Sequence, residues 1–345
     1  MKTGIKAALV GALALVSVAL GAVIGSAGVS LGDVAVIIWS RLFGTELPQR
    51  IASNTANIIW SIRLPRVLCA FLTGAALSVS GAVMQSVLRN PLASSYTLGV
   101  SSGASLAAAL VAINGFTLPF LPFLTMPLCG FAGGVVTVFL AMALSMRFDR
   151  NMENVTIVLT GMVLGLFVNA FLTIITAFSG DHLRVLIFWQ MGSFEGLKWR
   201  NCGILLPVVV AGLTALWTQS REMDLMTFGE EQALSAGVEL KRVKVLLLGV
   251  ATLMTGAAVS FSGIIGFVDL IVPHVTRRLF GSRHRVSLPM NALVGGAFMV
   301  LCDLVARTIL SPRSLPIGAI TALIGAPFFA WIYFRRRGGK GHDRA

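Results

Sequence analysis

The sequence predicts an all-α, multi-pass membrane protein with about ten transmembrane helices and an inverted internal repeat. Hydrophobic residues make up 56% of the 345 residues, and charged residues only 12%. A helix that spans a bilayer needs roughly 20 apolar residues, and runs of that length recur along the chain. This composition is too apolar for a soluble globule. Because the linkers between the runs are short, residues 1–345 are expected to form one integral-membrane domain.

The apolar runs give the expected spans in order. Residues 1–28 hold two lysines and an apolar run that is longer than a signal-peptide core, so they are predicted to form the first span. The later runs lie at 64–88, 94–113, 119–145, 154–178, 201–219, 245–276, 287–306 and 315–334.

The block 245–276 is expected to hold two passes of unequal length. It lies between two basic stretches, KRVK at 241–244 and RRLFGSRHR at 277–285, that both favour the cytoplasmic side. Two full helices would need about 40 residues, which the block does not have. One pass is therefore expected to be short or broken near Gly263 and Gly266, which gives ten spans.

The distribution of Lys and Arg predicts that both termini are cytoplasmic. With a cytoplasmic N-terminus and one crossing per span, two thirds of the 27 Lys and Arg residues lie inside, as the positive-inside rule requires. The segment 221–244 and the basic tail 335–345 are then cytoplasmic. This topology accounts for the net charge of +13. Without aromatic–basic interleaving or a zinc pattern, nucleic acid is not an expected partner.

Two segments of the chain repeat one another. TGAALSVSGAV (73–83) and TGAAVSFSGII (255–265) agree at seven of eleven positions, and Pro91 and Pro273 follow at the same offset. The predicted topology places the copies in opposite directions, which is typical of the inverted repeats of transport proteins. Small residues at four-residue spacing also allow close helix packing, so packing alone would explain the residue types.

A polar segment, GEEQALSAGVELKRVK at 229–244, interrupts the apolar sequence. Gly229 or Thr227 can start a short helix, Glu230 and Glu231 suit its positive end, and Gly237 can end it. A rigid helix on the cytoplasmic side is an element that a soluble partner protein can bind and displace. The alternative is a solvated connecting loop.

Arginines stand at the outer ends of two spans. Arg63 and Arg66 lie in SIRLPRVLCAF, and Arg307 follows Asp303. The positive-inside rule disfavours arginine there, and a guanidinium pairs well with carboxylates of an external partner. Anchoring to lipid headgroups is the alternative.

The stretch MQSVLRNPLASSYTLGVSSGAS, at 84–105, is expected to lie near a transport route. Asn90 and Pro91 break one span, and small residues open the next. Irregular backbone at membrane depth survives only where protein or water satisfies it. Tight packing is the alternative role. The candidate route residues are Gln85, Asn90, Pro91, Gly99, Ser101, Ser102 and Gly103.

Catalytic and metal sites are not expected. The four cysteines, Cys69, Cys129, Cys202 and Cys302, form no CxxC pair. No HExxH motif and no paired intramembrane aspartates occur, so we expect no enzyme. The tail sequence GGKGH lacks the Ser or Thr of a P-loop, so any use of ATP is expected to fall to another chain.

Several longer stretches carry a resemblance to a known family. They are RLPR (63–66), TGAALSVSGAVMQ (73–85), NPLA (90–93), LGVSSGAS (98–105), FWQMGSFEGLKWR (188–200), GEEQALSAGV (229–238), SGIIGFVDLIVPHVTRRLFG (262–281), DLVAR (303–307) and LPIGAITALIGAPFF (315–329). In these stretches the chain resembles the permease subunits of ABC importers for iron–siderophores, haem and cobalamin. The resemblance covers residues 58–334 in the family's order.

The resemblance implies a homodimer or heterodimer of permeases in the bacterial inner membrane. Two ATP-binding subunits, which use ATP and Mg, would lie below, and a substrate-binding protein would dock outside. It also implies that Arg63, Arg66 and Arg307 receive acidic residues of that binding protein. The residues that would couple to the ATPase are Gly229, Glu230, Glu231, Ala233, Gly237 and Val238.

Two positions depart from the family pattern. The family often has Gly where this chain has Asp269, and Glu where it has Ser314. A carboxylate in an apolar run is costly and commonly functional, although Asp269 could also cap a short helix.

An ion-gradient-driven secondary transporter is the alternative function. It would need ionisable residues deep in several spans, and the sequence offers only Asp269 and Asp303. The sequence does not specify which chelate is carried.

Overall fold

The computed structural model describes residues 3–25, 28–149, 151–178, 180 and 183–338, and all of the regular elements in these ranges are helical. Seven helices in this part of the chain are long and apolar enough to cross a membrane. They are α1 (Thr3–Val23), a continuous helix Ser53–Val87, α6 (Thr125–Phe148), α7 (Asn154–Ala177), α9 (Trp199–Thr218), α12 (Leu240–Ser262) and α14 (His284–Thr308). The predicted all-α membrane fold is confirmed.

The expected number of about ten crossings is not confirmed, because two of the three further helices are short. Helices α5 (Val100–Asn114) and α13 (Val268–Phe280) have 15 and 13 residues, fewer than the roughly 20 that span a bilayer. Helix α15 (Ile317–Gly338) has 22 residues, and its apolar sequence runs to Phe334 before three arginines. Most of the predicted basic tail, residues 339–345, lies outside the described residues.

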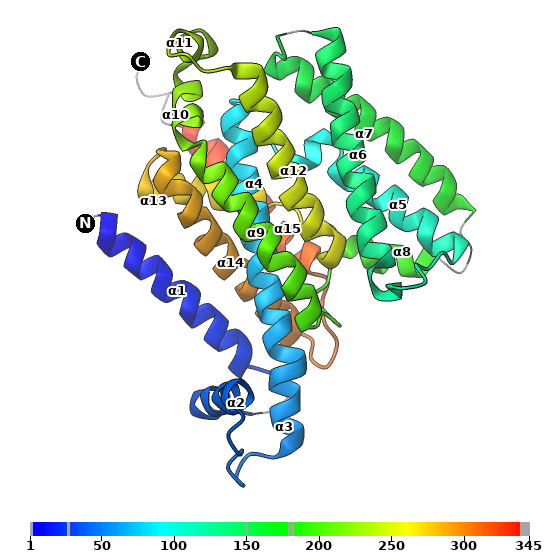
Figure 1. Ribbon diagram of the computed structural model, residues 1–345, viewed down its shortest axis with the longest axis vertical. Helices are drawn as coiled ribbons and strands as arrows, with labels where there is room; N and C mark the ends of the chain where they lie inside the picture. The colour runs from blue at the N-terminus through cyan, green and yellow to red at the C-terminus, as the bar shows by residue number, and fades with distance from the viewer. Residues whose placement is uncertain (1–2, 26–27, 150, 179, 181–182, 339–345) are drawn as a thin grey trace.

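Shorter elements lie at the two ends of the molecule (Figure 1). Helices α10 and α11 lie at one end, which we call the α11 end, and α2 and α3 lie at the other, the α2 end. The shorter elements of the described chain outside α5 and α13 are α2 (Leu31–Phe43), α3 (Ser53–Ile58), the π-turn η1 (Ile59–Arg63), η2 (Ser95–Leu98), η3 (Pro122–Leu124), α8 (Leu183–Met191), α10 (Ser220–Phe228) and α11 (Glu230–Ser235). Helix α4 (Leu64–Val87) is the long last part of the continuous helix.

The α2 end is more ordered than the sequence analysis predicted. The span expected at 64–88 begins earlier, because α3, η1 and α4 form one helix of 35 residues. Helix α2 is amphipathic, and its buried face joins a small core with the start of that helix. Ser30 caps it by accepting from the Asp33 N–H, and Gly44 ends it in the left-handed conformation.

Helix α4 forms the centre of the bundle. In the most apolar window of its continuous helix 89% of residues are buried, compared with 22% in α7. Helices α9, α12, α13 and α14 pack around it (Figure 1). A side chain at Gly74 would collide with the carbonyl oxygen of Gly295 on α14, and one at Gly81 would collide with that of Asp269 on α13. Small residues therefore bring three helix backbones into contact.

The two copies of the internal repeat run in opposite directions. The first lies wholly within α4, which leads toward the α11 end, and the second begins in α12, which leads away from it (Figure 1). Their directions agree with the predicted inversion. The prolines at matched offset differ in structure, however. Pro91 lies in a turn after α4, whereas Pro273 lies inside α13.

The apolar block 245–276 is broken where the sequence predicts. Helix α12 ends at Ser262, and α13 begins at Val268. Gly263 and Phe267 have positive φ angles of 73° and 69°, which turn the chain between the two helices. The Tyr96 hydroxyl donates to the Ile265 carbonyl oxygen at 2.9 Å, and the Ser193 N–H donates to the Ser262 carbonyl oxygen at 2.8 Å. The break is therefore satisfied by other parts of the chain.

The close contact of α4 with α14 is testable by adding one methyl group. Gly74→Ala should lower the free energy of unfolding by about 1–3 kcal/mol, because the new Cβ meets backbone that cannot move aside. The measurement is an unfolding titration in detergent. Gly11→Ala is the matched control, since a Cβ at Gly11 meets nothing within 4 Å. Equal stability of the two variants would contradict the close helix contact.

Candidate functional site

The polar segment at the α11 end folds into two short helices and the start of a long one. Helix α10 ends at Phe228, and Gly229, with φ 140°, turns the chain into α11. Glu230 and Glu231 occupy the first turn of α11, where negative charge complements the unpaired N–H groups. The predicted short helix is therefore present, with Gly229 at its start.

Gly237 ends α11, as predicted, in a Schellman motif. The Val238 N–H donates to the Ala233 carbonyl oxygen at 3.0 Å, and the Gly237 N–H donates to the Leu234 carbonyl oxygen at 2.9 Å. The φ of Gly237 is 83°, a conformation that favours glycine. Ala233 and Val238 are both buried, so this contact anchors the inner face of α11.

The outer face of α11 combines charge with apolar surface. Glu231 is exposed, and the side chains of Leu234 and neighbouring Phe228 are 56% and 71% exposed. Glu230 points back instead, and its Oε1 lies 2.8 Å from the Nζ of Lys244 on α12. The two adjacent glutamates thus have different environments, because Glu230 is paired with Lys244 and Glu231 is exposed.

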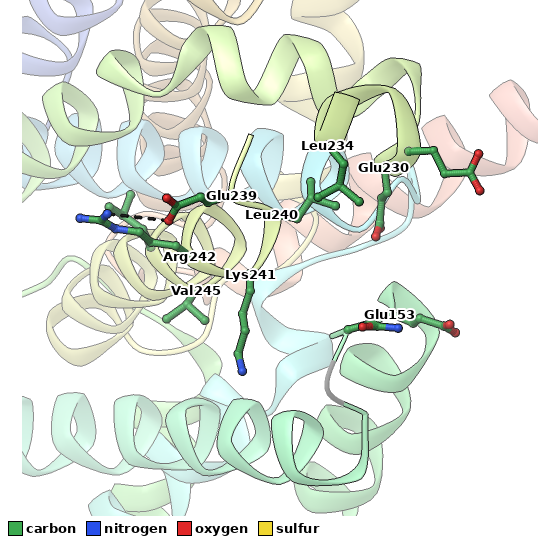
Figure 2. A pocket seen from close by; sticks show the side chains of 11 residues that line it. Glu153, Glu230, Leu234, Glu239, Leu240, Lys241, Arg242 and Val245 are labelled. Atoms are coloured by element: carbon green, nitrogen blue, oxygen red, sulfur yellow. Dashed lines mark ion pairs between the residues drawn. The ribbon is translucent and has the colours of Figure 1, made fainter. Parts of the chain in front are cut away.

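A wide cleft lies beside α11 (Figure 2). It has a volume of about 1110 Å³, and Figure 2 shows Glu153 across it from Glu230 and Leu234. Its lining residues are Asn151, Glu153, Glu230, Glu231, Leu234, Glu239, Leu240, Lys241, Arg242, Val245 and Leu246. Charges of both signs and apolar side chains suit a protein surface. Among the described residues no group of three or more His, Cys, Asp and Glu side chains could hold a metal.

The three predicted docking arginines meet at the α2 end, and all are largely buried. Arg66 makes a bidentate pair with Asp303, with Nε and a terminal nitrogen 2.9 and 2.8 Å from Oδ1. Arg307 lies 3.6 Å from the same carboxylate and donates to the carbonyl oxygen of Gly21. Arg63 donates to the Val23 carbonyl oxygen at 2.8 Å. Arg66 and Arg307 therefore share one anion, and Arg63 and Arg307 bind the last carbonyls of α1.

Gln85 lies in a buried polar cluster that joins α4, α13 and the segment before η2. Its amide nitrogen donates to the carbonyl oxygen of Asp269 at 3.1 Å, and its amide oxygen accepts from Arg277. The Ser94 hydroxyl donates to Oδ2 of Asp269. Asp269 is buried and lies in the first turn of α13, and its Oδ1 has no hydrogen-bond partner among the described residues. Its contacts tie helices together.

Asn90 and Pro91 are exposed in the turn after α4. They line a cleft of about 460 Å³ with the start of α7, including Asn154 and Val158. Arg89, at the same turn, has a positive φ of 50°. Of the seven predicted route residues, Asn90 and Pro91 are the two that are exposed.

The other predicted route residues pack helices together. A side chain at Gly99 would meet Thr137 of α6, and one at Gly103 would meet Thr137 and the Gly133 carbonyl oxygen. Ser101 and Ser102 are half-buried. The structure therefore favours packing for Gly99 and Gly103, the alternative that the sequence also offered, whereas Asn90 and Pro91 line a cleft.

Two of the scattered cysteines are neighbours in the fold. The Sγ atoms of Cys69 on α4 and Cys202 on α9 are 2.9 Å apart and buried. Residues 133 positions apart with no motif between them carry no sequence signal for this contact. His274 has its ring edge-to-face with Phe328, which fits a packing role.

A bundle of long apolar helices with a short polar helix at one end defines a multi-pass membrane protein of the permease class. The FecCD transport family matches residues 13–335. The chain belongs to that family.

Named relatives and a solved structure agree with this assignment. The chain is 42% identical over 290 residues to the cobalamin import system permease protein BtuC of Halobacterium salinarum, covering 84% of this chain and 77% of that one. It is 37% identical over 295 residues to the hemin transport system permease protein HmuU of Yersinia pestis, covering 83% and 86%. A metal-chelate type ABC transporter solved in an inward-facing conformation matches with a TM-score of 0.82 and 28% identity, over 97% of this chain and all of that one.

The arginine cluster at the α2 end should be a major source of stability. Asp303→Asn should cost about 3–5 kcal/mol in the free energy of unfolding, because it leaves buried guanidinium groups without their shared anion. Asp33→Asn, which breaks the exposed pair with Arg50 at 3.2 Å, should cost less than about 1 kcal/mol. Detergent unfolding titrations compare the two. A smaller loss for Asp303→Asn than for Asp33→Asn would overturn this interpretation.

Proposed function

We propose that this chain is the membrane-spanning subunit of an ABC importer that carries cobalamin, haem or an iron chelate into the cell. Two separate ATP-binding subunits supply the energy and use ATP and Mg, and a substrate-binding protein delivers the ligand from outside. The family assignment and the relatives named above support this function. The chain itself binds no nucleotide and performs no catalysis.

The single observation that carries the proposal is the construction of α11. Its inner face is fixed by Ala233, Val238 and the pair between Glu230 and Lys244, while Glu231 and Leu234 face outward beside a wide cleft. A connecting loop needs no such anchoring. A helix held rigidly with a mixed apolar and acidic face suits a soluble protein partner. We assign this partner as the ATPase, and α11 as the coupling helix.

The proposed topology places the α11 end in the cytoplasm with both chain termini. Lys241, Arg242 and the basic residues that follow α13 then lie inside, as the positive-inside rule favours. Ten crossings result when the short helices α5 and α13 and the apolar part of α15 are added to the seven long ones. Short helices at membrane depth fit this scheme, since protein contacts satisfy the break between α12 and α13.

A second permease subunit would pack on the side of α7. This helix is mostly exposed and apolar, and it begins beside the cleft that contains Asn90. The exposed large hydrophobic residues of α7 are Val155, Leu159, Met162, Val163, Leu166, Phe167, Phe171 and Ile174. A ligand path between two such surfaces would be lined by apolar groups, which suits a large ligand that is passed on rather than held. Lipid would cover the remaining apolar surface.

The binding protein would dock at the α2 end. Arg63, Arg66 and Arg307 together outnumber the single negative charge of Asp303, so this cluster carries a net positive charge. Since the guanidinium groups are largely buried, docking through them requires either a rearrangement or attraction at longer range. Charge complementarity of this kind raises the rate of association.

The coupling role of α11 is tested with Leu234→Lys, which places a charge on the exposed outer face. Both the ATPase retained on purification and ligand uptake should fall by about tenfold or more, as for a central interface residue. Insertion into the membrane should stay normal, because Leu234 contributes little to the core. Uptake of cobalamin, hemin and a ferric hydroxamate is measured in turn.

Glu46→Lys is the control, since Glu46 is exposed in the loop after α2 at the other end. It should leave the ATPase bound. Full ATPase retention and uptake in Leu234→Lys would refute the coupling role. Uptake that persists without ATP and stops on collapse of the proton gradient would favour the secondary transporter instead.

A further inference from the structure

A lysine is buried completely near the start of α12. Lys244 has no exposed surface and is among the largest fully buried side chains in the described chain. Burial of an ammonium group is costly unless the charge is paired and hydrogen-bonded. Its neighbours Lys241 and Arg242 are exposed, so the three basic residues of KRVK differ in environment. A buried cation at this point needs partners on other elements.

Lys244 has two partners, and they belong to different parts of the fold. Its Nζ lies 2.8 Å from Oε1 of Glu230 on α11, and it donates to the carbonyl oxygen of Met152 at 2.8 Å. Both distances are those of charge-assisted hydrogen bonds. Met152 lies in the turn between α6 and α7. One ammonium group therefore connects the coupling helix to that turn.

The turn that receives this hydrogen bond has a fixed and unusual conformation. Met152 is fully buried, and its φ is 53°, a region that side-chain-bearing residues rarely adopt. The carboxylate of Asp149 accepts from the N–H groups of Asn151 at 2.9 Å and Glu153 at 2.6 Å. Chiefly the Glu153 N–H, and then that of Asn151, hold the pKa of Asp149 below its ordinary value. The Asp149 carboxylate thus ties the turn to the start of α7.

Helix α7 leads directly from this turn to a second cleft. Asn154, its first residue, lines the cleft of about 460 Å³ together with Asn90 and Pro91. On the other side of Lys244, the glycines that flank α11 have φ angles of 140° and 83°. These glycines form the turns that join α11 to α10 and α12, and the wide cleft in Figure 2 separates α11 from the turn before α7. The buried side chain of Lys244 connects α11 to the turn before α7.

We propose that Lys244 is the positioning residue that transmits displacement of α11 to the start of α7, and so to the cleft beside Asn90. The inference rests on the proposed function, because it assumes that an ATPase displaces α11. When α11 is displaced, Glu230 moves with it and shifts the ammonium group of Lys244 through their hydrogen bond. The second hydrogen bond of Lys244 then shifts the carbonyl of Met152, and with it the turn. Lys244 touches neither ligand nor nucleotide.

The test compares Lys244→Met with Lys241→Met in the whole importer. The complex is purified with its own ATPase and binding-protein subunits and placed in liposomes, with cyanocobalamin, hemin and a ferric hydroxamate supplied in turn. The measured quantity is the ratio of ligand transported to ATP hydrolysed. Lys244→Met should lower this ratio by about tenfold, in the range of allosteric couplings, while ATP hydrolysis continues. Lys241→Met should leave it within about twofold.

The ratio separates transmission from a merely structural role. A destabilised but intact linkage would lower transport and hydrolysis together and leave the ratio unchanged, which would overturn the inference, as would a normal ratio with normal rates. If Lys244→Met does not assemble, Glu230→Gln decides, because it keeps the lysine and the shape of the pair and should also lower the ratio. An unchanged ratio in that variant overturns the inference. If the wild-type complex shows no ATP-driven uptake, the proposed function itself fails.

Discussion

The structure depends on the close approach of α4 to the helices around it. At Gly74 and Gly81 the backbone of α4 touches that of α14 and α13, and Ser80 donates across to the Ala251 carbonyl oxygen of α12 at 3.0 Å. In a bilayer, lipid tails are as apolar as the side chains, so burial alone does not hold helices together. Close backbone packing and satisfied polar groups do. The repeated TGAA segment places such residues on both α4 and α12.

The broken segments of the fold follow from the same constraint. Residues 263–267 leave helical geometry within the apolar block. Tyr96 donates to the carbonyl oxygen of Ile265 in this segment, and Ser193 donates to that of Ser262 just before it. The Ile317 N–H at the start of α15 likewise donates to the Gly192 carbonyl oxygen at 3.1 Å. Irregular backbone therefore meets irregular backbone in the interior. Each non-helical segment in the interior therefore needs another non-helical segment close by to satisfy its backbone hydrogen bonds.

Hydrophobic periodicity predicted the fold well where each helix could be recognised alone. The expected spans at 154–178 and 201–219 differ from α7 and α9 by one or two residues. Amphipathic α2 was missed, although its caps Ser30 and Gly44 were local signals.

The site was predicted only in part. Gly229 and Gly237 bound α11 as expected, but the partners of Arg63 and Arg66 lie 40 and 237 positions away. Lys244, next to two exposed basic residues, gave no sign of burial.

Charged groups hold the two ends of the bundle, and small residues hold its middle. Asp303 joins α14 to α4 at the α2 end, and Lys244 joins α12 to α11 and to the turn before α7 at the other. Ionic hydrogen bonds in a dry interior keep their geometry, because breaking one leaves a charge unpaired. Helix faces made of glycine and serine carry few side chains that interlock. The charged groups at the ends therefore determine which helices are tied together.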